Sequence, residues 1–226
     1  MVADALQFDD IPTISVDNTT DPSSVPAQPV PFPHHRFFFS NGFDVVSAQA
    51  GPFQPASGSQ LVHFNTSESS TAQIGLAQLR ENPCFRFNFL GFGFGCLSAN
   101  ESCVFDVKGL QWNGVKEVVQ ASRTIEITSC PGTANCSLSH QVLDSAAAVT
   151  FANLTSINIT LTVAGQPQDW WGDDLQIAWT DNTCSIASCR SQEPNTIMRA
   201  KNPVFGHVMA RHPFRWSARH HNTRHY

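Results

Sequence analysis

The strongest constraint on the fold is a succession of about nine short segments with the periodicity of β-strands, separated by turn residues. No stretch between them has the periodicity of a convincing amphipathic helix. The pattern predicts an all-β chain folded as one antiparallel β-sandwich of the jelly-roll type. The segments span residues 4–11, 34–46, 59–65, 84–95, 103–112, 115–127, 146–154, 156–165 and 169–179, and the apolar run 72–79 is ambiguous. The predicted core contains Leu6, Phe8, Phe87, Val104, Phe151, Ile159, Leu175 and Ile177.

The chain is long enough for one such domain, and its character changes near the C-terminus. Residues 1–184 are predicted to form the sandwich, with the Pro-, Ser- and Thr-rich stretch 12–33 as a surface connection within it. Residues 185–226 lose strand periodicity, and we expect them to be a disordered, basic tail.

Charge is distributed unevenly between these parts. Residues 1–195 carry 18 acidic and seven basic side chains, a net charge of −11, whereas residues 196–226 carry six Lys or Arg and no acid. Because phosphate contacts need a basic face, the acidic body argues against nucleic-acid binding. No apolar stretch approaches the roughly 20 residues of a membrane span. The oligomeric state is not indicated by the sequence.

The segment 84–95, CFRFNFLGFGFG, has Phe at alternate positions until Leu90, after which the alternation shifts by one residue. Such a shift predicts a β-bulge or a bend at the glycines. The glycines also match a G-x-G-x-G pattern. Because no helix follows and Phe fills the positions between them, a bent core strand is favoured over a phosphate-binding loop.

The seven cysteines are spaced like a disulfide framework. Cys96 and Cys103 bracket LSANES, and Cys130 and Cys136 bracket PGTAN; both are short polar loops between predicted strands. We therefore expect Cys96–Cys103 and Cys130–Cys136 disulfides, with Cα atoms within about 7 Å of each other. Zinc ligation fits less well, because there is no paired CxxC motif and no helix with suitably spaced histidines.

Six N-x-S/T sequons agree with the disulfides in favouring a secreted or cell-surface glycoprotein. The N-terminus, MVADALQFDD, has neither the basic nor the apolar region of a signal peptide. We interpret the chain as lacking its true N-terminus, as in a fragment or an incomplete gene model. The alternative is a cytosolic protein with incidental cysteines. The acceptors of the sequons are Asn18, Asn65, Asn100, Asn135, Asn153 and Asn158.

A carboxylate interrupts the apolar row predicted for the last strand, DWWGDDLQIAW. Strict alternation places Asp173 on the face that points to the core, and burying an unpaired carboxylate is costly. Some partner must therefore compensate its charge. The same face carries Trp171, Leu175, Ile177 and Trp179.

On the first predicted strand, alternation also turns the side chain of Asp10 toward the core. If that strand lies beside the last one, Asp10 approaches Asp173, with Asp9 and Asp174 at the rim. Neighbouring carboxylates repel unless a proton or a cation lies between them, and calcium prefers such oxygen ligands. The sequence therefore predicts one structural calcium held by these four residues. The alternative is that each Asp accepts backbone N–H groups of a nearby loop.

Aromatic side chains are the candidates for ligand binding. Trp112, beside an Asn-Gly turn, and Trp170, which alternation turns away from Trp171, are predicted to contact a sugar, although tryptophans in strands are often core residues. No G-x-S-x-G motif or other catalytic arrangement is legible, so we do not expect an enzyme. A polysaccharide-active enzyme is the less favoured alternative.

Several motifs together resemble an uncharacterised domain of unknown function from secreted and cell-surface proteins of filamentous fungi. They are LQFDDIP, FFFSNGF, the 96–103 loop, CPGTANC and VAGQPQDWWGDDLQIAWTDNTC, in this order over residues 6–184. Cys84 and Cys189 fall outside that pattern, so the partners of Cys84, Cys184 and Cys189 stay open. The resemblance implies the fold and the compartment, and that family has no established activity.

A more remote likeness is to jelly-roll carbohydrate-binding modules, in which acids at the two chain ends commonly hold one structural calcium. We therefore expect a non-catalytic, secreted fungal surface or cell-wall domain with a cell-wall glycan as its partner. The alternative is a purely structural or adhesive wall domain with no small ligand.

Overall fold

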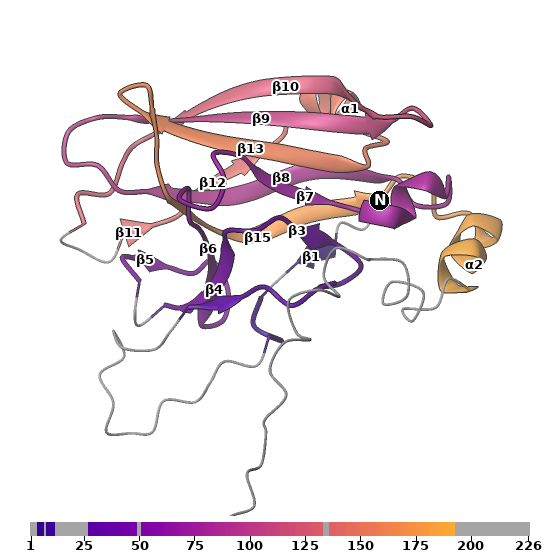
Figure 1. The fold of residues 1–226 in the computed structure, drawn as a ribbon, viewed down its shortest axis with the longest axis horizontal. Helices are drawn as coiled ribbons and strands as arrows, with labels where there is room; N and C mark the ends of the chain where they lie inside the picture. Colours follow the sequence, from indigo (N-terminus) through magenta and orange to yellow (C-terminus); the bar gives the residue numbers. More distant parts are fainter. Residues whose placement is uncertain (1–3, 7, 12–26, 49–50, 133–135, 193–226) are drawn as a thin grey trace, which may run out of the picture. The chain divides into compact units, whose positions relative to one another are not determined.

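The computed structural model describes residues 4–6, 8–11, 27–48, 51–132 and 136–192. Within these ranges the chain forms two large β-sheets that face each other (Figure 1). All strand pairings in the two sheets are antiparallel, so the predicted sandwich is confirmed.

The first sheet is built around the last strand, β15 (Trp170–Trp179). β1 (Asp4–Leu6) pairs with β15, so the first and last strands lie side by side as predicted. The order across the sheet is β12 (Ser139–Val142), β8 (Phe87–Cys96), β15, β6 (Gln60–Phe64), β4 (Phe43–Ser47) and β2 (Gln28–Pro29).

The second sheet contains the two long strands of the middle of the chain. Its order is β10 (Glu117–Ile127), β9 (Cys103–Trp112), β13 (Ser156–Val163), β7 (Ala72–Gly75) and β3 (Phe38–Phe39), and β14 (Gln166–Pro167) also pairs with β13. A separate pair, β5 (Phe53–Gln54) and β11 (Cys136–Ser137), is parallel.

Aromatic rings fill the space between the two sheets. Trp170 of the first sheet lies 6.0 Å, centroid to centroid, from Phe105 of the second, and Phe94 lies 4.5 Å from Phe105. These contacts join the two layers through one buried cluster. The rings of Phe43, Phe64, Phe92 and Phe94 also contact Trp170.

The predicted core is confirmed for six of its eight residues, Phe8, Phe87, Phe151, Ile159, Leu175 and Ile177, which are all buried. The prediction is wrong for Val104, which is half-buried because β9 turns Cys103 and Phe105 inward. The side chain of Leu6 lies outside the described residues.

Two irregularities face each other in the pairing of β8 with β15. Between Asp173 and Gln176, β15 contains one residue more than β8, and between Gln176 and Ile177 β8 contains the extra residue, Leu90. The predicted shift of the Phe alternation at Leu90 is therefore confirmed. In β15 the extra residue brings Asp174 into a left-handed conformation, with φ of 54°.

The segment 146–154, predicted as a strand, begins instead with a helix, α1 (Ser145–Thr150). The carboxylate of Asp144 accepts a hydrogen bond from the N–H of Ala147 at 2.8 Å, which caps the helix N-terminus. Three consecutive alanines favour a helix over a strand, and this local preference outweighs the apolar run that suggested a strand.

The domain extends beyond its predicted end at residue 184, because residues 184–192 form α2 (Cys184–Gln192). A disulfide joins Cys189 to Cys84, with Cα atoms 6.2 Å apart. The buried guanidinium of Arg190 donates to the carbonyls of Asp181 and Cys84, at 2.6 and 3.2 Å. These contacts attach α2 to the sandwich; the rest of the predicted tail, 193–226, lies outside the described residues.

Both predicted disulfides are confirmed. Cys96–Cys103 and Cys130–Cys136 have Cα separations of 6.5 and 6.0 Å, within the limit expected for a bridge. The structure also settles the open pairings, because Cys84 bonds to Cys189 and leaves Cys184 as an exposed free thiol.

The Cys84–Cys189 disulfide is expected to stabilise the domain more than Cys96–Cys103. The two bridges span 105 and 7 residues, and a longer loop restricts the unfolded chain more strongly. Replacing Cys84 and Cys189 by Ala should lower the free energy of unfolding by about 4–5 kcal/mol. Replacing Cys96 and Cys103 by Ala should lower it by about 2 kcal/mol. Urea unfolding without reductant measures both losses, and equal losses would contradict this explanation.

Candidate functional site

Asp173 lies on the outer face of the first sheet, under a loop, and not in the core row predicted for it. It is 0% exposed and stands opposite Gly93 in β8. A side chain at Gly93 would touch Leu138 and His140, which cover the outer face, and cross-strand partners share a face. The bulge that follows Asp173 returns Leu175 to the core side, so the predicted common row is wrong.

The carboxylate of Asp173 holds the loop that covers it. Oδ2 accepts hydrogen bonds from the backbone N–H groups of Ala56 and Ser57, at 2.8 and 3.1 Å. Oδ1 is buried and accepts no hydrogen bond from the described residues of this loop. One oxygen therefore orders the loop, and the other is buried without a donor from that loop.

Asp9 binds the next part of the same loop. Its Oδ1 accepts from the N–H groups of Ser59 and Gln60, at 2.6 and 3.2 Å. Gly58 lies between the two sets of donors with a φ of +59°, and a Cβ there would overlap the carboxylate of Asp9. This loop conformation therefore needs glycine.

Burial raises the pKa of Asp173 above the ordinary value of 3.8, and the nearby charge of Asp9 raises it further. The backbone hydrogen bonds of Asp174, Ser57 and Ala56 act in the opposite direction. The net effect is a carboxyl group that keeps its proton to a higher pH than an exposed aspartate.

The four aspartates predicted to share a calcium have three different surroundings. Asp10 contacts His34 and His35 instead of Asp173. Asp174 accepts from Gln176 at 2.9 Å and lies 3.6 Å from His140. The structure thus brings Asp9, and not Asp10, near Asp173.

Calcium stays a prediction, now limited to Asp9 and Asp173. Oδ1 of Asp173 and the carboxylate of Asp9 are oxygen ligands of the kind that calcium takes. The loop 56–60 presents N–H groups to both carboxylates, which is the alternative that the sequence left open. The remaining calcium ligands would have to be backbone carbonyls and water.

The two tryptophans predicted to bind a ligand differ in accessibility. The prediction is wrong for Trp170, which is fully buried in the core because the alternation of β15 before its bulge turns it inward. Trp171, predicted to be core, is half-buried against Phe53 and His63 on the outer face. Trp112, at the end of β9, is half-buried and keeps part of its ring at the surface.

Two polar side chains lie against Trp112, and a third is linked to them through Glu117. The guanidinium carbon of Arg80 lies 4.2 Å from the indole centroid, and Glu117 is the cross-strand partner of Trp112. Glu117 Oε1 lies 3.6 Å from Arg80, and its Oε2 accepts from Gln73 at 3.0 Å. We refer to Gln73, Arg80, Trp112 and Glu117 as the Trp112 cluster.

The outer face of the second sheet continues from this cluster as a polar surface. Asn158 of β13 stands between Gln73 of β7 and Lys108 of β9, and Lys108 pairs with Ser122 of β10. The next row of cross-strand neighbours consists of Thr160 of β13, Asp106 of β9 and Thr124 of β10. Each of these side chains is half-buried or exposed.

A shallow hollow of about 320 Å³ lies elsewhere, at the N-terminal end of β9 and the C-terminal end of β10. Its walls include Glu101 and Glu126 but no aromatic residue. It therefore lacks the ring surface that sugars usually contact, and the Trp112 cluster is the better candidate.

The sequons occupy different environments. Asn100 is exposed in the loop between two cysteines, which is where a glycan is best accommodated. Asn65 and Asn153 are half-buried, and Asn158 lies within β13 on the polar face. Asn18 and Asn135 lie outside the described residues.

Sequence reasoning missed the grouping of Asp10 with His34 and His35. The doublet His34-His35 is visible in the sequence, but nothing there connects it with an acid 24 residues earlier. It also missed the bulge of β15. The doublet Asp173-Asp174 is a weak signal for that bulge, because Asp adopts left-handed conformations more readily than most residues.

Comparison with family models identifies most of the chain. The family described as Domain of unknown function (DUF7371) matches residues 3–190. The chain belongs to this family. The resemblance to an uncharacterised domain is thereby confirmed, and the match includes Cys189 and most of α2. No curated protein matches the chain.

Carbohydrate-binding modules are among the solved structures similar to this family member. The family 22 module of Clostridium thermocellum Xyn10B is 11% identical over 70% of this chain and 95% of that chain, with a TM-score of 0.36. The CBM22-1 xylan-binding domain from Paenibacillus barcinonensis Xyn10C is 12% identical over 65% and 87%, with a TM-score of 0.31. TmCBM61, solved with beta-1,4-galactotriose, is 17% identical over 63% and 88%, with a TM-score of 0.34.

The raised pKa of Asp173 predicts a specific pH dependence of stability. The folded state holds this proton more tightly than the unfolded state, so stability falls as pH rises from about 3.8 through the raised pKa. Asp173→Asn has no such proton. In EDTA, the free energy of unfolding of the wild type minus that of the variant should decrease over this interval. A constant difference in urea unfolding across the interval would contradict the burial of an ionisable Asp173.

The calcium prediction has its own test at neutral pH. If calcium binds Asp9 and Asp173, its addition after chelation should raise the Tm of the wild type, because an ion that binds only the folded state stabilises it. Asp173→Asn should show a much smaller rise. An equal Tm with calcium and with EDTA would mean that the two carboxylates serve only as acceptors for the loop amides.

Proposed function

We propose that this domain is a non-catalytic, secreted domain of a fungal cell-surface or cell-wall protein that binds glycan through the Trp112 cluster. The observation that carries the proposal is the position of this cluster. A half-buried tryptophan lies at the end of a polar sheet face, among side chains able to donate and accept hydrogen bonds.

The chemistry of the cluster suits a polyhydroxyl ligand. A sugar presents apolar C–H patches that pack on aromatic rings, and hydroxyl groups that need both donors and acceptors. Arg80 is a donor, Glu117 an acceptor, and Gln73 both. The polar rows of β13, β9 and β10 extend this surface in the direction a linear chain of sugars could follow.

The disulfides support the proposed compartment. Three bridges join six of the seven cysteines, and such bridges persist in oxidising surroundings outside the cytosol. None of the helices in the described part of the chain combines the length and apolar character needed to cross a membrane.

Glycosylation and glycan binding must use different surfaces. A glycan on Asn158 would cover the polar face beside Gln73. We therefore propose that Asn100, in an exposed loop, carries a glycan and that Asn158 does not.

Binding to immobilised chitin, β-glucan and mannan tests the proposal. The wild type should be retained on at least one polymer, and Trp112→Ala should weaken binding about tenfold or more, equivalent to ~1.4 kcal/mol. Trp112→Phe, which keeps an aromatic ring, and Glu117→Gln should have smaller effects. The control is Val142→Ala, which shortens a 62% exposed side chain on the other sheet.

Each result has a definite meaning when thermal unfolding shows that the variants remain folded. Retained binding by Trp112→Ala would place the glycan site elsewhere. Absence of binding by the wild type to all three polymers would favour the alternative of a structural or adhesive wall domain without a small ligand.

A further inference from the structure

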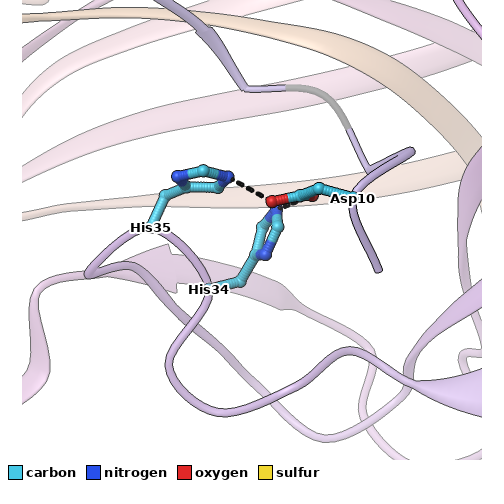
Figure 2. Close-up of side chains that lie close together, drawn as sticks. All are labelled: Asp10, His34 and His35. Atoms are coloured by element: carbon cyan, nitrogen blue, oxygen red, sulfur yellow. Dashed lines mark hydrogen bonds and ion pairs between the residues drawn. The ribbon is translucent and has the colours of Figure 1, made fainter. Parts of the chain in front are cut away.

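Three side chains with metal-binding groups converge where the N-terminal segment meets the turn before β3. Figure 2 shows the imidazoles of His34 and His35 directed at the carboxylate of Asp10. His35 Nε2 lies 2.8 Å from Asp10 Oδ2, and His34 Nε2 lies 3.6 Å from Asp10 Oδ1. The three ligand atoms lie within 4.8 Å of one another.

A strained turn holds the two histidines in place. The N–H groups of His34 and Phe37 each donate to the carbonyl of the other residue, at 2.9 and 2.8 Å. Between them, His35 and Arg36 both have positive φ, 47° and 71°. Such turns normally contain Asn and Gly, and non-glycine residues in this conformation concentrate at sites where a side chain must be aimed.

Contacts on both sides stabilise this turn. The guanidinium of Arg36 donates to the carbonyl of Arg190 at 2.6 Å, so the turn is tied to α2. His34 is only 6% exposed, and its ring stacks on that of Phe8, with centroids 5.6 Å apart. The same Phe8 is buried two residues before Asp10, so one packing contact positions both sides of the cluster.

The spacing of the ligand atoms fits a tetrahedral metal ion. Ligands at about 2.0–2.1 Å from zinc in a tetrahedral arrangement are ~3.3 Å apart. The separations of His35 Nε2 from Oδ2 and of His34 Nε2 from Oδ1 of Asp10, 2.8 and 3.6 Å, lie on either side of this value, and one ligand atom from each residue lies within 4.8 Å of the other two. Small rotations of His35 and Asp10, which are 52% and 56% exposed, would equalise them.

We infer that Asp10, His34 and His35 bind one divalent transition-metal ion of the zinc class, with solvent as the fourth ligand. Zinc and the neighbouring transition metals readily take two imidazoles and one carboxylate as ligands. Calcium and magnesium take mostly oxygen ligands, so they fit this set less well. The ion links the segment that follows β1 to the turn before β3. Its role is to fasten the N-terminal segment, independently of any glycan bound at Trp112.

Zinc titration of the full-length chain tests this site. The sequence has five further histidines beyond residue 192, so the background variant carries Asn at His207, His212, His220, His221 and His225. In this background, calorimetry should show one zinc ion bound per chain, and zinc should raise the Tm because it binds the folded state. Cobalt should give the visible absorption of a tetrahedral site.

Two surface substitutions remove ligands without disturbing the core. Asp10→Asn and His35→Ala should each weaken zinc binding about tenfold or more and remove the rise in Tm. The matched control is His140→Ala, since His140 also faces a single carboxylate, that of Asp174, at 3.6 Å. It should bind zinc like the background variant.

Three outcomes would overturn the inference. They are absence of zinc binding in the background variant, equal binding by Asp10→Asn and the control, and an unchanged Tm on zinc addition. A Tm rise with calcium that Asp10→Asn does not alter would belong to Asp9 and Asp173, so the two metal predictions remain separable.

Discussion

The paired irregularities of β8 and β15 decide which side chains enter the core of this domain. Without the extra residue beside Asp174, one alternation would run through the whole of β15, and Trp170 and Leu175 would point to opposite sides. With it, both are buried between the sheets. The extra residue in β8 compensates at Leu90, so that Phe89 and Phe92 also share the interior.

The same irregularity leaves Trp171 and Asp173 on the outer face of the first sheet. Trp171 and Asp173, excluded from the core, are covered by the loop that begins at β5. Gly95 lets this cover approach, because a side chain there would collide with Phe53 and Leu138. Asp173 then becomes a buried acceptor for the loop amides, which explains why a carboxylate is kept beside two tryptophans.

The N-terminal segment reaches three parts of the domain through four consecutive residues. Phe8 and Ile11 are buried, Asp9 accepts the amides of the loop 59–60, and Asp10 faces the two histidines of the turn. Neighbouring acids thus have separate roles. Both acids hold the N-terminal segment against the domain, whereas the Trp112 cluster lies on the polar outer face of the second sheet.

Local information in the sequence determined the fold class, the two short-loop disulfides, most of the core and the shift at Leu90, because alternation and cysteine spacing are properties of neighbouring residues. The tertiary structure alone decided the burial of Trp170, the separation of Asp10 from Asp173, the Cys84–Cys189 bridge and the grouping of Asp10 with His34 and His35. Each depends on a bulge or on contacts between distant segments. A one-residue bulge reverses the side-chain direction beyond it. Alternation counted along the sequence therefore assigns the wrong face to the residues that follow the bulge.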